Sequence, residues 1–349
     1  MYFKNRGYRV FFLTTCQWGS IHEELKAKGV RADEIKISKS FSLIYYIKMI
    51  LFLIRYSKKN NIGVIHSHLQ VPNLVSSISR FFIKAKVFNV RHNSDVIELG
   101  GSSKEKVIEK VINRLSDHII AISDKVKTQL IDKEGVNSKK IYRINNGYRF
   151  SDYENLSINE NEYLKIKAKY HCRLLIVSPG RLIKTKRHEI TIKGIKELQL
   201  KGYDAQLLIL GEGPEHKSIE TFIKQTGIEE WVHLLGYIPN ISDYLKASDI
   251  VVLLSESEAS SNIVKEAGYF EKPVIVCENV GDFSDYIVNG QNGFLLSKED
   301  PLSEFIKLIE SVYTNKELLK GIGAKLKNSI LAEFDIELVG KQYEELQNK

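Results

Sequence analysis

The sequence has 349 residues, a length that allows two domains with a buried core each. Hydrophobic residues make up 43% of the chain and charged residues 27%, with only 22 glycines and 6 prolines, which excludes a disordered or collagen-like protein. Residues 1–150 carry 27 basic and 12 acidic side chains, a net charge of +15, whereas residues 151–349 have a net charge of −7, so we expect the first half to face an anionic partner.

Short apolar runs alternate with longer amphipathic segments along the whole chain. Runs that are continuously apolar, rather than alternating, are typical of strands buried on both faces of a parallel sheet. The sequence therefore predicts an α/β protein of two facing, doubly wound, Rossmann-like domains with a cleft between them, residues 1–155 and 156–330, and a last helix in residues 331–349 that packs back across the join. The predicted strands are residues 8–14, 34–37, 64–67, 87–91, 118–122, 141–144, 174–178, 205–210, 232–235, 250–254, 274–277 and 293–296.

The three cysteines, Cys16, Cys172 and Cys277, are far apart and show no CxxC spacing, which predicts buried thiols in a reducing compartment. Residues 10–13 are too short for the core of a secretory signal. The most apolar stretch, residues 41–54, is shorter than the ~20 residues needed to cross a bilayer and has lysines in and after it. We therefore expect a cytoplasmic protein. The stretch is either a buried crossover helix or a helix that lies on the inner face of the cell membrane.

In the second half, the run 250–254 leads into a polar loop and then a helix that begins near residues 260–262. Backbone N–H groups at a helix start can bind a phosphate. Glu258 lies in the loop and Glu266 about one turn into the helix, and carboxylates accept hydrogen bonds from sugar hydroxyls. The alternative is a capped surface helix with two solvated glutamates.

A second constellation follows the run 174–178. A Pro-Gly turn at Gly180 leads to two cations, Arg181 and Lys186, five residues apart. Arg offers a planar fork and Lys a point charge, a pair suited to a diphosphate. A solvated basic turn would explain Lys184 and Arg187 equally well.

These constellations belong to a longer series of motifs in a fixed order. The series is Val64-Ile-His66-Ser-His68, Arg91-His92-Asn93, Ile144-Asn-Asn146-Gly147, Gly180-Arg181 with Lys186, Gly211-Glu-Gly213-Pro214, Val232 to Pro239, Glu258 to Glu266, Lys272-Pro273 and Asn289-Gly290. Its order and spacing resemble those of the family-4 retaining glycosyltransferases of the GT-B fold. The resemblance covers nearly the whole second half and is looser in the first.

The resemblance implies a role for each matching residue. Arg181 and Lys186 would stabilise the diphosphate of a nucleotide-sugar donor, next to Gly180. Glu266 would bind the ribose and Glu258 the transferred sugar. His92 would contact the sugar. Sugar and phosphate would also be bound by the backbone of Ser261, Asn262 and Ile263. The base would be bound by the backbone of Tyr237 and Ile238.

No Asp-x-Asp occurs in the chain, so we expect no cofactor and no metal, with Arg181 and Lys186 acting in place of one. The expected partners are a nucleotide sugar and a glycan or lipid-linked acceptor, with membrane-surface contact through the basic half. No nucleic-acid-binding pattern accompanies the positive charge. His66 and His68 share a strand face but suggest no third metal ligand.

The chain departs from the family at Ala259 and Ser261, where many members have Gly, and more consequentially at Gly281-Asp282 and at its start. Asp282 stands where a Gly pair is common and would put an anion near the diphosphate unless it turns away. Residues 1–13 match the end of the family's first helix and the strand after it, so the first strand and its Gly-rich loop are expected to be missing, through a wrong start or because a partner chain supplies them. An inactive scaffold subunit is therefore an open alternative. A phosphorylase or epimerase of the same fold is another. An NAD enzyme is disfavoured, because the Gly211-Glu-Gly213 motif lacks the third Gly or Ala of a dinucleotide-binding fingerprint.

Overall fold

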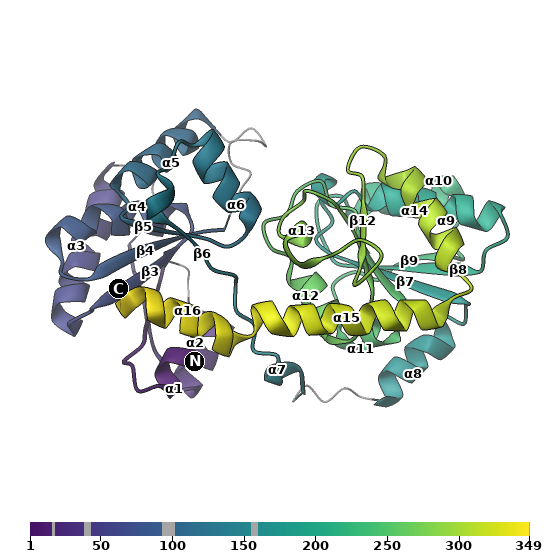
Figure 1. Cartoon of the computed structure of the whole chain (residues 1–349), viewed down its shortest axis with the longest axis horizontal. Coiled ribbons are helices and arrows are strands. Elements are labelled where there is room, and N and C mark those ends of the chain that lie inside the picture. The colour runs from purple at the N-terminus through teal and green to yellow at the C-terminus, as the bar shows by residue number, and fades with distance from the viewer. Residues whose placement is uncertain (16–17, 38–42, 93–101, 155–159, 349) are drawn as a thin grey trace. The chain divides into compact units, whose positions relative to one another are not determined.

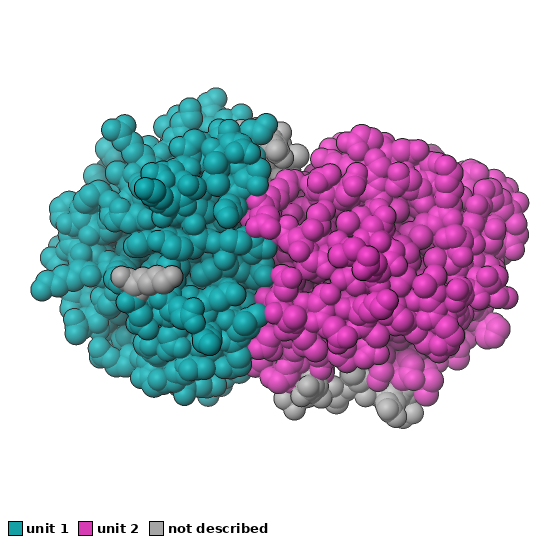
Figure 2. Space-filling view, viewed as in Figure 1, with its two compact units in different colours: residues 1–122, 126–147, 336–349 teal, residues 123–125, 148–335 magenta. Residues whose placement is uncertain are grey.

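The computed structural model describes residues 1–15, 18–37, 43–92, 102–154 and 160–348. The chain divides into two compact units, coloured separately in Figure 2. Unit 1 contains residues 1–122, 126–147 and 336–349, and unit 2 contains residues 123–125 and 148–335. Each unit has parallel strands flanked by helices (Figure 1), so the predicted α/β class is confirmed.

The described part of unit 2 is built on one six-stranded sheet in which every pairing is parallel. Its spatial order is β12-β11-β10-β7-β8-β9. From β7 the chain winds outward through β8 and β9, returns to pair β10 with β7, and then winds outward on the other side. The strands are β7 (Leu174–Pro179), β8 (Ala205–Leu210), β9 (Val232–Leu234), β10 (Ile250–Leu253), β11 (Val274–Cys277) and β12 (Phe294–Leu296).

The sheet of unit 2 is covered by helices, and all residues of β7, β10 and β11 are buried. This burial is why their sequences are continuously apolar. The covering helices are α7 (Ser151–Glu154), α8 (Glu160–Lys169), α9 (His188–Leu200), α10 (His216–Thr226), α11 (Ser242–Ala247), α12 (Asn262–Tyr269), α13 (Phe283–Tyr286), α14 (Pro301–Val312) and α15 (Lys316–Phe334), with a 3₁₀ turn η4 (Lys184–Lys186).

In unit 1 the described strands form two parallel sheets. One has two strands, β1 (Phe11–Thr14) and β2 (Arg31–Glu34), and the other has the order β3-β4-β5-β6. The strands of the second sheet are β3 (Val64–His68), β4 (Lys86–Arg91), β5 (His118–Ala121) and β6 (Ile141–Arg143). The expectation of a strand missing before Tyr8 stays a prediction.

The helices of unit 1 include both ends of the chain. The last helix, α16, contacts the first, α1, and the hydroxyl of Tyr2 donates to Glu344 over 3.0 Å. No helix within the described ranges is long and apolar enough to cross a membrane. The helices are α1 (Tyr2–Asn5), α2 (Ser20–Ala27), α3 (Leu43–Asn60), α4 (Gln70–Ser79), α5 (Ser103–Leu115), α6 (Asp124–Thr128, shared with unit 2) and α16 (Ile336–Asn348), with short turns η1 (Arg80–Phe82), η2 (Gln129–Lys133) and η3 (Ser138–Lys140).

Two sequence expectations differ from the structure. The strand expected at residues 34–37 is shifted to β2, Arg31–Glu34. β2 lies at a sheet edge and carries charged residues, two of which pair: Arg31 donates to Asp33 over 2.8 Å. Edge strands of this kind have no apolar run that would mark their bounds. Of the expected buried thiols, Cys277 is buried but Cys172 is only partly so, and Cys16 lies outside the described residues.

Two glycines of α15 offer a matched test of how closely this helix packs. A Cβ on Gly323 would overlap the carbonyl oxygen of Glu271, whereas a Cβ on Gly321 meets nothing within 4 Å. Gly323→Ala should therefore lower the midpoint of urea unfolding, and Gly321→Ala should raise it slightly, because alanine stabilises an exposed helix position by roughly 0.5–1 kcal/mol. Equal midpoints for the two variants would contradict the close approach of α15 to Glu271.

Candidate functional site

The loops after β7 and β10 meet at the carboxyl edge of the unit 2 sheet, because these two strands are neighbours. Lys186, the last residue of η4, donates a hydrogen bond from Nζ to Oε1 of Glu258, and Ser255 Oγ donates to the same oxygen over 2.8 Å. The Lys186 and Glu258 side chains are only 18% and 12% exposed. The structure therefore brings together one cation and one carboxylate from the two predicted constellations.

Arg187 holds these loops in place. Its backbone has a φ of 51°, in the left-handed region, and its guanidinium donates to the carbonyl oxygens of Leu254 over 2.7 Å and Lys298 over 3.1 Å. The interpretation of Arg187 as a solvated basic residue is therefore wrong, although Lys184 is exposed as that interpretation requires. The planar guanidinium group of arginine has several N–H donors in fixed directions, so that it can bind carbonyl oxygens that follow two different strands at once.

The Gly-Glu-Gly motif fixes the loop after β7 from its other side. A Cβ on Gly211, which has a φ of 148°, would overlap the carbonyl oxygen of Gly180, and a Cβ on Gly213 would overlap that of Leu182. The two glycines are thus needed for close packing of backbone on backbone. Arg181, in this loop, is exposed and forms no ion pair with any residue in the described part of the chain, which leaves its guanidinium open to an anion.

Helix α12 begins at Asn262 with Ser261 as N-cap, at the position predicted, and it starts directly beyond the loop that holds Glu258. The Ser261 side chain is buried and makes no capping hydrogen bond to the helix. The N–H groups of the first turn, including that of Ile263, have no partner within the helix. Asn262 accepts a hydrogen bond at Oδ1 from the hydroxyl of Tyr148 over 2.6 Å.

Glu266 lies one turn further along α12 and is partly buried. Burial raises the pKa of its carboxyl group, and a hydrogen bond from the Tyr153 hydroxyl, 3.2 Å from Oε1, acts in the opposite direction. Glu258 is mostly buried as well. The alternative of two solvated glutamates on a surface helix is therefore wrong for both carboxylates.

The anion that the sequence placed near the site, Asp282, is neutralised inside the core. Its Oδ2 accepts hydrogen bonds from Lys265 Nζ and from Ser260 Oγ, and both charged side chains are fully buried. Lys265 Nζ also lies 4.8 Å from the ring centre of Tyr286 and 4.6 Å from that of Phe334. The sequence analysis did not identify Lys265 as a buried cation. The one feature of the sequence that could have indicated it is that Lys265 follows the apolar residues Ile263 and Val264 on α12.

The segment after β9 carries the two residues predicted to meet a base. Tyr237 is 71% exposed, and Ile238 packs partly buried against the core of unit 2. The N–H of Gly211 donates to the carbonyl oxygen of Gly236 over 2.8 Å, so this segment lies beside the Gly-Glu-Gly loop. Their role in binding a base stays a prediction.

In unit 1, His92 follows β4 directly and pairs with His68 at the end of β3. Nε2 of His92 lies 2.8 Å from Nδ1 of His68. Desolvation lowers the pKa of both imidazoles, to about 4 for His68, so both are neutral at pH 7. Nε2 of His66 lies 2.7 Å from Nε2 of Gln347 in α16. Within the described ranges, no group of three His, Cys, Asp or Glu residues could hold a metal ion.

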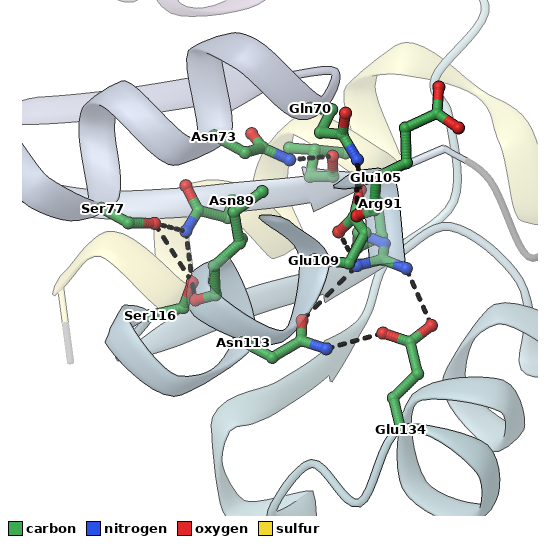
Figure 3. Close-up of polar contacts among 12 residues, drawn as sticks. Gln70, Asn73, Ser77, Asn89, Arg91, Glu105, Glu109, Asn113, Ser116 and Glu134 are labelled. Carbon is green, nitrogen blue, oxygen red and sulfur yellow. Dashed lines mark hydrogen bonds and ion pairs between the residues drawn. The ribbon is translucent and has the colours of Figure 1, made fainter. Parts of the chain in front are cut away.

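A buried polar network fixes the end of β4 just before His92 (Figure 3). Arg91 forms ion pairs with Glu109 of α5 and with Glu134, the latter over 2.8 Å, and all three side chains are at most 7% exposed. Asn113 donates to Glu134 over 2.6 Å, and Gln70 donates to Glu109 over 3.0 Å. Because its charge is satisfied by two buried carboxylates, Arg91 is held in one place, and it fixes the backbone directly before His92.

Both halves of the chain match family models. "Glycosyltransferase Family 4" matches residues 1–151, and "Glycosyl transferases group 1" matches residues 159–329. The chain belongs to the family-4 glycosyltransferases. It is a glycosyltransferase, as the motifs around Gly180 and Glu258 predicted.

Similar proteins of this family come from several bacteria. The chain is 25% identical over 299 residues to N-acetyl-alpha-D-glucosaminyl L-malate synthase of Bacillus anthracis, covering 82% of this chain and 75% of that protein. It is also 25% identical over 334 residues to the capsular polysaccharide biosynthesis glycosyltransferase CapM of Staphylococcus aureus, covering 91% and 84%.

Solved structures confirm the predicted GT-B fold. Anabaena HepE, determined in complex with UDP, has a TM-score of 0.82 at 18% identity and covers 98% of this chain and 93% of its own. A glycosyltransferase from Rickettsia africae has a TM-score of 0.83 at 20% identity and covers 99% of this chain and 91% of its own.

The buried Lys265–Asp282 pair can be tested by a double-mutant cycle. Lys265→Met or Asp282→Asn alone should destabilise unit 2 by about 3–5 kcal/mol, because each leaves a charge buried without its partner. The double variant should be less destabilised than the sum of the two. Urea unfolding midpoints followed by circular dichroism measure this, and additive effects would contradict a coupled pair.

Proposed function

We propose that this glycosyltransferase moves a sugar from a UDP- or GDP-linked donor to a hydroxyl of a glycan or lipid-linked acceptor in cell-surface polysaccharide biosynthesis, with retention of anomeric configuration. One observation carries the proposal: Lys186 and Glu258 are in contact at the carboxyl ends of β7 and β10, where the strand order of the unit 2 sheet reverses, beside the start of α12. In open parallel sheets, nucleotide ligands bind at such an edge.

The donor half of the reaction follows from the charges at this edge. Cleavage of the bond between the sugar and the diphosphate develops negative charge on the phosphate oxygens and positive charge on the sugar carbon. Lys186, Arg181 and the N–H groups at the start of α12 are fixed positive charges or dipoles that would stabilise the leaving diphosphate. Because these groups neutralise the diphosphate and the sequence contains no Asp-x-Asp, we propose that no metal ion is required.

The sugar and nucleoside contacts follow the resemblance of the motifs. Glu266, whose carboxylate is oriented by Tyr153, would accept hydrogen bonds from the ribose hydroxyls. Glu258 would accept them from the transferred sugar while remaining paired with Lys186. The contact of His92 with the sugar is part of the same proposal, and its neutral imidazole could donate or accept one hydrogen bond.

The acceptor class is supported by what relatives act on. CapM is named for capsular polysaccharide biosynthesis, and a relative from Campylobacter jejuni, 25% identical over 301 residues, is named for transfer to a diphospho-undecaprenol-linked glycan. An acceptor with a diphosphate would complement the net charge of +15 in residues 1–150. We propose that the reaction takes place in the cytoplasm or at the inner face of the cell membrane.

Lys186 and Lys184 provide a matched pair for testing the site, since both belong to η4 but only Lys186 contacts Glu258. Lys186→Met should lower kcat roughly 10²–10³-fold, as for loss of one preorganised charge at a leaving group. Lys184→Met should leave kcat unchanged. The measurement is nucleotide release with UDP- and GDP-sugars, with and without EDTA.

Thermal shift with UDP and GDP distinguishes a loss of donor binding from misfolding. The wild type should be stabilised by one of the two nucleotides, and Lys184→Met equally so. Lys186→Met should still unfold cooperatively without ligand but show a smaller shift with the nucleotide. Full activity of Lys186→Met would refute the site assignment. NMR of the anomeric proton at early times reports whether configuration is retained.

A further inference from the structure

Helix α3 in unit 1 exposes an unusual set of side chains. Leu43, Ile44, Ile47 and Leu51 are between 46% and 75% exposed. At 100° per residue these four positions fall on one side of the helix, within an arc of about 100°. The opposite side is buried: Tyr45, Met49 and Ser57 face the interior, where Tyr45 and Met49 pack with Ile35 and Val75. The exposed apolar residues are therefore not part of the core of unit 1.

Cations accompany this apolar stripe along the same helix. Lys48, Arg55, Lys58 and Lys59 are all exposed. At 100° per residue, Lys48, Arg55 and Lys59 fall beside one border of the stripe and Lys58 falls within it. Helix α3 contains no acidic residue. The stripe and these four cations together are named the α3 face. It combines a large apolar side with a cationic border, a pattern typical of helices that lie in the plane of a membrane surface.

The connection of helix α3 to the strands of unit 1 fixes the direction in which it runs. Helix α3 connects the carboxyl end of β2 to the amino end of β3, so its first turns lie toward the carboxyl edge of the parallel strands. That edge carries His68 and His92. Leu43, Ile44, Ile47 and Leu51 all lie in the first half of α3, and three of the four cations lie in its second half.

We propose that the α3 face binds the surface of an anionic lipid bilayer, with Leu43, Ile44, Ile47 and Leu51 inserted at the level of the headgroups and the four cations at the lipid phosphates. The charge of the surrounding unit favours this occupant, since residues 1–150 carry a net +15. A second copy of the chain is disfavoured, because a symmetric contact would bring the four cations of both copies into one interface that contains no acidic residue from α3. The proposal holds whatever sugar is transferred.

The test is co-sedimentation of the full chain with lipid vesicles in the absence of donor and acceptor. Vesicles of pure phosphatidylcholine and vesicles of equal parts phosphatidylcholine and phosphatidylglycerol are compared at about 0.1 M and about 1 M salt. The wild type should bind the anionic vesicles at least tenfold more tightly than the neutral ones, and binding should weaken at high salt. Failure of the wild type to bind anionic vesicles would overturn the proposal.

Two variants separate the α3 face from general stickiness. Ile44→Ser with Ile47→Ser should reduce binding to anionic vesicles at least tenfold. Leu200→Ser is the matched control, because Leu200 is an exposed apolar residue at the end of α9 in unit 2, and this variant should bind like the wild type. Equal binding by the double variant and the wild type would refute the assignment to α3.

Fold and self-association are checked on the same samples. Circular dichroism and the thermal midpoint should be the same for all three proteins, since the replaced side chains are exposed. Light scattering measures the mass. A wild-type dimer that the double variant converts to a monomer, with no vesicle binding by either, would show that α3 is a contact between copies and would overturn the lipid proposal.

Discussion

Parallel pairing of β7 with β10 is the constraint on which the donor edge depends. These strands are separated by more than 70 residues in the sequence, yet their pairing places both of their carboxyl ends at one edge of the sheet. The loop with Lys186 and the loop with Glu258 can then touch, and α12 starts beside them. Each of these loops begins directly after its strand, so the strand determines where the loop lies. Without the pairing of β7 with β10, Lys186 and Glu258 would not be brought into contact.

The structure also shows where charge is kept away from water. Arg91 pairs with Glu109 and Glu134 next to His92, Lys265 of α12 pairs with Asp282 at the start of α13, and Arg187 joins the loops after β7 and β10. In each case a cation inside the unit is satisfied by carboxylates or by backbone carbonyl oxygens. Such groups hold nearby functional side chains in one arrangement, and removing a single partner is costly because the remaining charge is unsatisfied.

The sequence predicted more of unit 2 than of unit 1. Strands such as β7, which are buried on both faces, are visible as apolar runs, and the residues that follow them are then placed at a known edge of the sheet. Arg187 and Lys265 could not be recognised, because a cation in a loop and a cation on an apolar helix face look solvated until their partners are known. Those partners, Leu254 and Asp282, are 67 and 17 residues away. β2 was misplaced because an edge strand with polar residues has no apolar run.

The buried pair of Lys265 and Asp282 restricts which substitutions either position can accept. A chain that acquires the aspartate first carries a lone buried anion, and one that acquires the lysine first carries a lone buried cation. Either single-residue intermediate would be less stable than a chain with both residues or with neither. A substitution at one of the two positions is therefore tolerated only together with a change at the other, or in a chain with stability to spare.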